Sequence, residues 1–305
     1  MNITNITFFN RWRNGDCFIN KEYVRDIISR YPNGVTFRYA HDNHPNIVSD
    51  LNCEHVSLSS IHPIGTFTPL AQVENILYIN TWVGCWIGKH LKEKDHANFY
   101  CLHDMWKEFY QALNLEMKGD YSYYHPSIDF RKFDLTEANN YLFRVDPKEI
   151  ILVCNGVQQS EQSSMGDMRN IIIGLATKFP EKEFLITHKV DVDLPNVTCT
   201  DYLFSAPTGN LNQIAFLSMF VKLIIGKNSG PFTYAHIKEN MNNYQKTFMC
   251  FSHKMRDCLM GEGEYLANSF FSDTVDDTKA IEICENLIQY PSYANYKKPT
   301  VELFE

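Results

Sequence analysis

The 305-residue sequence has no paired-cysteine motif and no long hydrophobic run. Its nine cysteines are scattered without a C-x-x-C pair, which argues against a disulfide framework and against a zinc or redox site. The longest apolar stretch, residues 214–225, is interrupted by Ser218 and Lys222 and is far shorter than the roughly 20 residues of a membrane-spanning helix. We therefore expect no transmembrane span.

The sequence also lacks a concentration of positive charge. The net charge is −8 and no Lys/Arg cluster occurs, so nucleic acid is not expected as a partner. Arg11 and Arg13 follow only a few apolar residues, unlike a secretory leader or an anchor. With thiols that are expected to be reduced, this pattern predicts a cytoplasmic protein, and peripheral contact with a membrane stays open.

What is present is an alternation of strand and helix patterns. The first half predicts a helix from the turn at residues 13–16 to Ile28, a helix over 101–115, and strands at 3–9, 35–39, 54–58 and 75–80. The second half predicts helices at 167–178, 211–220 and 278–289, and strands at 150–154, 183–187, 196–199, 222–225 and 246–252.

This alternation predicts an α/β protein with two Rossmann-like domains facing a cleft. The N-terminal domain is expected at residues 1–145 and the C-terminal domain at 146–285, with a tail at 286–305 that packs back toward the N-terminal domain. In such folds, ligands bind outside the carboxyl ends of the strands.

The turn Asn228-Ser229-Gly230-Pro231 lies between a short buried strand and a predicted helix. Pro231 suits the first turn of that helix, and backbone N–H groups at a helix start bind phosphate. An ordinary strand-turn-helix connection is the alternative reading.

Several motifs in order resemble glycosyltransferase family 9, the heptosyltransferase-like enzymes with a two-domain GT-B fold. They are Arg13-Asn14-Gly15-Asp16, HDMWKEFYQALNL from His103, IAFLSMFVKLIIGKNSGP from Ile214, and the strand KTFMCFS that follows. The resemblance implies a metal-independent transfer of sugar from a nucleotide-diphosphate donor to a glycan or similar hydroxyl acceptor. It implies no cofactor and no metal, and we read Asp191-Val192-Asp193, the nearest string to a metal-binding D-x-D motif, as a solvated turn.

The resemblance also assigns roles to residues. Asp16 would be the general base that takes the proton of the acceptor hydroxyl; its alternative role is a helix N-cap. The acceptor side would include Arg13, Asn14, Gly15 and Trp82. The donor side would include Asn155, Gly156, Gln158, Ser160, His188, Asn228, Ser229, Gly230, Pro231 and Thr233.

The sequence departs from the family pattern around the donor phosphates. Asn228 and Thr233 stand where members commonly have Asp and His, and residues 157–166 lack the usual Lys. The positive charge of that Lys would be supplied by Arg13, Lys189 or Lys227, or the site would lack it. The 157–166 loop could equally be a solvated connector.

Aromatic residues offer a sugar-stacking surface on the acceptor side, although aromatics more often belong to a core. The candidates are Trp12, Trp82, Trp86, Tyr121, Tyr123, Tyr124 and His125.

Two other function classes stay open beside a glycosyltransferase that binds a nucleotide-sugar donor and a saccharide acceptor. One is another two-domain nucleotide-using transferase or epimerase. The other is a non-catalytic nucleotide-sugar-binding protein, motivated by the lost Lys, Asp and His.

Overall fold

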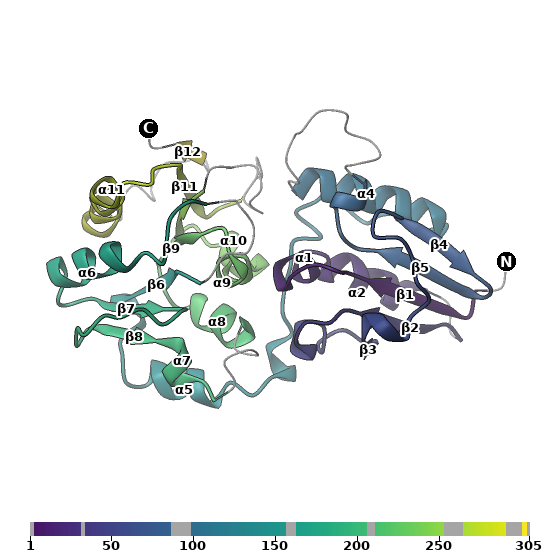
Figure 1. Cartoon of the computed structure of the whole chain (residues 1–305), viewed down its shortest axis with the longest axis horizontal. Coiled ribbons are helices and arrows are strands. Elements are labelled where there is room, and N and C mark those ends of the chain that lie inside the picture. The colour runs from purple at the N-terminus through teal and green to yellow at the C-terminus, as the bar shows by residue number, and fades with distance from the viewer. Residues whose placement is uncertain are drawn as a thin grey trace. The chain divides into compact units, whose positions relative to one another are not determined.

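The chain folds into two compact units, Met1–Lys132 and Phe133–Glu305, each with its own sheet (Figure 1). A computed structural model describes residues 3–31, 34–86, 99–156, 163–205, 211–252, 265–290 and 301–303. The division falls before α5 (Thr136–Leu142), a helix within the range expected for the N-terminal domain.

The described part of the first unit holds a five-stranded sheet in the order β3-β2-β1-β5-β4. The strands are β1 (Asn5–Phe9), β2 (Thr36–Ala40), β3 (Glu54–Val56), β4 (Leu70–Val73) and β5 (Ile76–Asn80). The buried β1 pairs in parallel with β2 and β5, and Phe9 lies opposite both Ala40 and Asn80. β4, which the sequence did not predict, forms an antiparallel hairpin with β5.

The helix predicted to reach Ile28 is interrupted at Asn20. Its amide nitrogen donates to the Asp16 carbonyl at 2.6 Å, and its amide oxygen accepts from the Trp106 indole at 2.7 Å. Asparagine side chains compete with helical hydrogen bonding in this way. The first unit therefore has α1 (Asn14–Phe18), α2 (Lys21–Arg30), α4 (Phe99–Ala112) and the short 3₁₀ turns η1 (Pro45–Ile47), η2 (Leu58–Ser60) and η3 (Phe130–Lys132).

The second unit holds a parallel sheet in the order β12-β11-β10-β9-β6-β7-β8. The strands are β6 (Ile150–Cys154), β7 (Glu183–Ile186), β8 (Val197–Cys199), β9 (Leu223–Lys227), β10 (Thr247–Phe251), β11 (Asn268–Ser272) and β12 (Val301–Leu303). The chain builds outward from β6 to one edge and then returns to build from β9 to the other. The strand order thus reverses between β6 and β9, where doubly wound sheets bind ligands.

Helices complete the second unit. Besides α5, they are α6 (Arg169–Lys178), α7 (Thr200–Leu203), α8 (Leu211–Ser218), α9 (Gly230–Ala235), α10 (Lys238–Met241) and α11 (Asp277–Gln289), with the 3₁₀ turn η4 (Pro147–Glu149).

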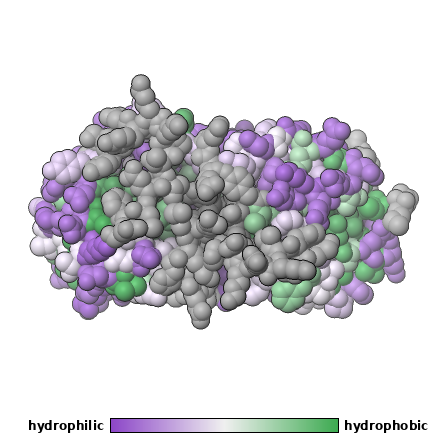
Figure 2. Space-filling view, turned by 90° about the horizontal axis from the view of Figure 1, so that it is seen from above, coloured by the Kyte–Doolittle hydropathy of each residue, from purple (hydrophilic) through white to green (hydrophobic). Residues whose placement is uncertain are grey.

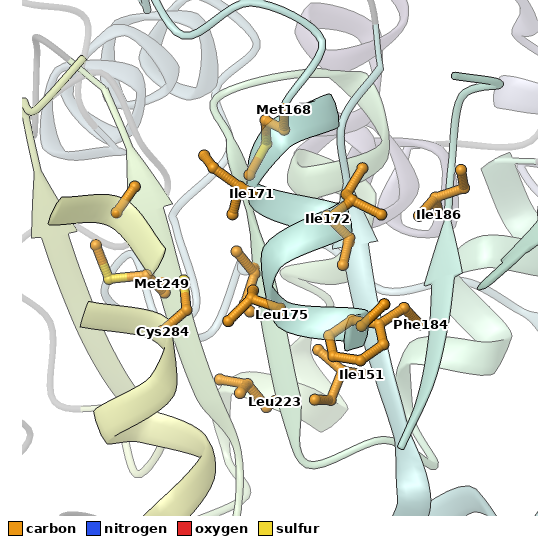
Figure 3. Packing of buried hydrophobic residues seen from close by; sticks show 14 of the residues in the cluster. Ile151, Met168, Ile171, Ile172, Leu175, Phe184, Ile186, Leu223, Met249 and Cys284 are labelled. Carbon is orange, nitrogen blue, oxygen red and sulfur yellow. The ribbon is translucent and has the colours of Figure 1, made fainter. Parts of the chain in front are cut away.

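One core cluster of this unit lies between the sheet and the helices α6 and α11 (Figure 3). Ile171, Ile172 and Leu175 of α6 point onto β-strand residues such as Ile151 and Phe184. Each such buried side chain contributes about 1.5–3 kcal/mol relative to exposure. At Gly174 a Cβ would lie 2.6 Å from Ile281 Cδ1, so a larger residue there would require the Ile281 side chain of α11 to shift.

The predicted C-terminal tail, residues 286–305, contains the end of α11 and a short strand. Residues 301–303 form β12, which pairs with β11, so this part of the tail is an edge strand of the second sheet. Residues 291–300, 304 and 305 lie outside the described part of the chain.

In the ranges that the structure describes, no helix is both long and apolar enough to cross a membrane. On the face seen in Figure 2, hydrophilic and hydrophobic residues are interspersed. The eight cysteines among the described residues are free thiols, most of them buried.

Candidate functional site

Two buried asparagines fix the loops that leave the carboxyl ends of β1 and β5. Asn10 Oδ1 accepts from the backbone N–H of Trp12 at 2.9 Å, and Asn80 Oδ1 accepts from that of Trp82 at 3.1 Å. Both are side-chain turns of the kind that asparagine favours. Because β1 and β5 are neighbours, the two indoles meet with ring centroids 4.6 Å apart.

Asp16 lies in the first turn of α1, next to this aromatic pair in the chain. Its Oδ2 accepts from the backbone N–H of Arg13 at 3.3 Å. Arg13 is the N-cap of α1, so the alternative that Asp16 is itself the cap is wrong. The carboxylate instead supplies one half of a capping box from the third helical position.

Burial raises the pKa of Asp16 to about 6, although its hydrogen bond to Arg13 acts in the opposite direction. The side chain is half-buried. A carboxyl group with this pKa is ionised at neutral pH and still accepts a proton more readily than an ordinary Asp, as a general base should.

The residues expected on the acceptor side are therefore gathered in one place. Arg13, Asn14 and Gly15 form the exposed or half-buried start of α1, and Trp82 contacts Trp12, the residue before Arg13.

Most of the other aromatic candidates belong to the core of the first unit. Trp86, Tyr124 and His125 are buried. Tyr124 stacks on Tyr23 with centroids 4.5 Å apart, and Tyr23 stacks in turn on Trp106 at 5.1 Å. The core alternative is correct for these three candidates, whereas Tyr123 is exposed and Tyr121 half-buried.

In the second unit, several of the expected donor residues that the structure describes lie near the reversal of strand order. Gly156 lies two residues after the end of β6, and Pro231 lies in the first turn of α9, the helix that follows β9. A Cβ on Gly156 would lie 3.4 Å from Pro231 Cγ and 4.0 Å from Thr187 Oγ1. The ends of β6, β7 and β9 thus converge on Gly156.

Asn155 organises this edge of the sheet. Its Oδ1 accepts from the N–H groups of Thr187 (3.1 Å) and His188 (2.9 Å), while its Nδ2 donates to the carbonyls of His188 (2.9 Å) and Asp167 (3.3 Å). The side chain is fully buried and has both donors and both acceptor positions occupied. Asn155 therefore positions the half-buried His188 and does not offer its own amide to a ligand.

Two hydroxyls at this edge lack a partner within the described ranges: Thr187 Oγ1 and Ser229 Oγ. Each residue is only 7% exposed. Leaving such a group without a hydrogen bond costs about 1–3 kcal/mol. A bound polar ligand would supply the missing partner. Thr187 is absent from the sequence-derived set, and its position as the residue directly after β7 is the signal that could have identified it.

The space above Gly230 is open. A Cβ built there would meet no atom within 4 Å. Ser229 is the N-cap of the six-residue helix α9, which starts at Gly230, and the Thr233 N–H donates to the Ser229 carbonyl at 2.8 Å. Asn228 is buried beside this turn.

Of the three candidate cations, Lys227 is already engaged. Its buried ammonium donates to the carbonyls of Gly166 at 2.6 Å and Met165 at 3.4 Å, and burial lowers its pKa. Lys189, just after β7, is exposed and lies 5.3 Å over the Tyr202 ring. Gln158 and Ser160 lie outside the described residues.

No cluster of metal-ligating side chains occurs in the part of the chain that the structure describes. Asp191 is exposed and accepts from Arg169, a surface ion pair at 3.4 Å.

Comparison with known proteins finds structures but no sequence relatives. No protein-family model matches the chain, and no curated protein matches it. A family 9 glycosyltransferase from Veillonella parvula is similar with a TM-score of 0.53 and 9% identity, over 93% of this chain and 92% of that one. The Escherichia coli heptosyltransferase WaaC with ADP is similar with a TM-score of 0.53 and 9% identity, over 95% and 99%.

A UDP-GlcNAc 2-epimerase from Neisseria meningitidis bound to UDP-GlcNAc is similar with a TM-score of 0.52 and 11% identity, over 98% and 94%. At these identities the similarity shows the fold alone. It confirms the predicted α/β fold of GT-B type, and structures of glycosyltransferase family 9 are among those that share it.

Proposed function

We propose that this protein is a glycosyltransferase that moves a sugar from a nucleotide-diphosphate donor to a saccharide hydroxyl, without a metal ion. The observation that carries the proposal is the edge of the second sheet, where two buried hydroxyls lack partners beside the open space at Gly230. Support comes from the fold, because similar structures hold ADP or UDP-GlcNAc.

In the proposed reaction, Asp16 takes the proton of the acceptor hydroxyl. The acceptor oxygen forms a bond to the anomeric carbon of the donor sugar, and the bond from that carbon to the diphosphate breaks. The nucleoside diphosphate leaves with the electron pair of that bond. Ser229 and Thr187 would donate hydrogen bonds to the donor, and the N–H of Gly230 would face its phosphates.

Lys227 is already hydrogen-bonded to backbone carbonyls, which limits how the charge on the leaving diphosphate can be neutralised. Because its ammonium holds backbone carbonyls, charge on the leaving diphosphate must be met by neutral donors or by exposed cations such as Lys189. This feature also favours the second candidate, a non-catalytic nucleotide-sugar-binding protein.

A third candidate is a nucleotide-sugar epimerase, since the UDP-GlcNAc 2-epimerase is about as similar as the transferases. An epimerase would change the sugar of the free donor without any acceptor.

We place the reaction in the cytoplasm because free, mostly buried thiols fit a reducing compartment.

A thermal-shift screen of ADP, UDP, GDP and CDP, each alone and as its common sugar conjugates, tests the proposal. A ligand that binds only the folded state raises the apparent Tm by mass action. The stabilising conjugate is then incubated with and without saccharide acceptors. Transfer supports the glycosyltransferase, acceptor-independent conversion supports the epimerase, and binding without turnover supports the binding protein.

A further inference from the structure

Three aromatic side chains form a cluster in the first unit, here named the tryptophan ledge: the exposed Trp12 and Phe67 and the half-buried Trp82. Trp82 is in contact with both others, with centroids 4.6 Å from Trp12 and 5.6 Å from Phe67. Trp12 is 43% exposed and Phe67 is 69% exposed. Large aromatics normally gain stability by burial, so two exposed rings that share a half-buried aromatic neighbour suggest recognition.

The ledge is held by buried polar groups. Asn80 accepts from the Trp82 backbone, and its Nδ2 also donates to the carbonyls of Thr66 at 2.7 Å and Thr68 at 3.3 Å, on either side of Phe67. One asparagine thus positions two of the three rings.

The third ring is fixed from the neighbouring strand. Asn10 holds the Trp12 backbone N–H, and Asn43 Nδ2 donates to the Trp12 carbonyl at 2.8 Å. Arg11 ties this loop to the loop that carries Phe67, because its guanidinium donates to the Ile64 carbonyl at 2.9 Å.

Gly84 gives Trp82 its place. A Cβ at Gly84 would lie 2.2 Å from Cζ2 and 2.4 Å from Cε2 of the indole, so the ring rests directly on the glycine backbone. Any larger residue would force the ring to move.

The chemistry of the ledge fits a sugar ring. The flat indoles match the C–H face of a pyranose, while the exposed Arg13 next to Trp12 can donate to hydroxyl groups. A lipid chain would instead need an aliphatic groove, yet the residues that flank Trp12 and Phe67 along the chain are Arg11, Arg13, Thr66 and Thr68. Beside Trp82, the apolar Val83 is buried.

We infer that the tryptophan ledge binds the acceptor saccharide by stacking on Trp12 and Trp82, and thereby presents its hydroxyl to Asp16 in the helical turn that follows Trp12. This inference rests on the proposed function for the role of acceptor, but the binding itself is independent of the donor.

The chain contains four tryptophans, which gives a direct test. In the full-length protein labelled with ¹⁵N-tryptophan, four indole N–H signals are assigned by single Trp→Phe variants. Methyl β-D-galactopyranoside, methyl β-D-glucopyranoside and methyl α-D-mannopyranoside are then titrated, with sorbitol as an acyclic control. We expect at least one glycoside to shift the Trp12 and Trp82 signals and to leave those of the buried Trp86 and Trp106 in place.

Variants separate binding from folding. Trp12→Ala should raise the Kd of that glycoside about tenfold, the loss of one stacking contact of about 1.4 kcal/mol. Gly84→Ala should shift the Trp82 signal in the free protein and weaken binding without removing a ring. Phe143→Ala, at a side chain 89% exposed in the other unit, should leave the Kd unchanged.

Other outcomes overturn the inference. It fails if no glycoside shifts the two signals, if sorbitol shifts them equally, or if phosphatidylglycerol vesicles shift them while the glycosides do not. A separate titration with the nucleoside diphosphates isolates the proposed function. Glycoside binding without nucleotide binding would refute the proposed function alone, and nucleotide binding without glycoside binding would refute the ledge alone.

Discussion

Gly156 lies against the ring of Pro231, so that a Cβ added to the glycine would be 3.4 Å from Pro231 Cγ. This contact joins the loop after β6 to the first turn of α9, the helix after β9, and the order of the sheet reverses between these two strands. The proposed donor site is built around this contact, at the carboxyl ends of β6 and β9 in the second unit. Each of its residues can be tested by substitution.

Replacing Thr187 by Val removes a buried hydroxyl that has no partner in the described structure. We expect the ligand-free protein to keep its stability or gain about 1 kcal/mol, because no hydrogen bond is lost. The Kd for the stabilising nucleotide should rise about tenfold, measured by calorimetry. An unchanged Kd would place the donor away from β7.

Replacing Gly230 by Val fills the open space before α9. The free protein should unfold at a similar temperature, because a Cβ there meets no atom within 4 Å. Nucleotide affinity should fall tenfold or more as the side chain crowds the phosphate approach. If affinity is retained, the phosphates do not lie over this glycine. A matched substitution at Gly166, where a Cβ also meets nothing within 4 Å, should be neutral for binding.

Asp16→Asn should abolish sugar transfer and change donor affinity by no more than a few-fold. The amide oxygen can still accept from the Arg13 N–H, so α1 should keep its start. Initial rates and donor calorimetry on the same preparation separate the two effects. Loss of donor binding with loss of transfer would contradict the role of base.

The pH dependence follows from the same carboxyl group. Since burial raises its pKa to about 6, the base is ionised above that pH, and kcat/KM should fall about tenfold between pH 6.5 and pH 5. Circular dichroism at pH 5 controls for unfolding. A profile flat down to pH 5 would assign the proton to another group.

The free energy of unfolding should depend on pH in the opposite sense to kcat/KM. At pH values between the unfolded-state pKa of Asp16, near 3.9, and its folded-state pKa, the folded protein binds more protons than the unfolded protein. The contribution of Asp16 to the free energy of unfolding therefore falls as the pH rises. Asp16→Asn should therefore stabilise the protein more at pH 8 than at pH 4.5, measured by denaturant unfolding.

Breaking the buried ion pair of Lys21 and Asp50 should destabilise the first unit. The pair is fully buried at 2.5 Å, and Arg25 also reaches Asp50 at 2.7 Å. Asp50→Asn should cost about 3–5 kcal/mol of unfolding free energy, because it leaves a buried ammonium without its counter-charge. The exposed pair of Lys107 and Asp104 is the control, and Asp104→Asn should cost less than about 1 kcal/mol.

Strands such as β6 and β7 are predictable from the sequence because their apolar, β-branched runs are buried on both faces. β6, with five buried residues reading IILVC, is such a run. β11 was not predicted, since NSFFS carries polar residues that become buried only through its neighbours in the sheet. The break between α1 and α2 depends on the Asn20 contact with Trp106, which lies far away in the sequence.

The candidate site was predictable only in part. Residues at strand ends, such as Gly156 and Ser229, are found from the order of strands and turns. The engagement of Lys227 with the loop before α6 and the unpartnered hydroxyl of Thr187 depend on three-dimensional packing. Sequence periodicity carries no information about either.

The hydrogen bonds that Asn80 makes at Trp82 and on either side of Phe67 limit how the tryptophan ledge can change. Because one amide sets the backbone at both Trp82 and Phe67, substitutions at these three positions should be strongly non-additive in double-mutant cycles. An altered preference for the bound sugar would then be reached by exchanging the rings while Asn80 is retained. Asn80 itself should tolerate few substitutions in variants that keep this binding surface.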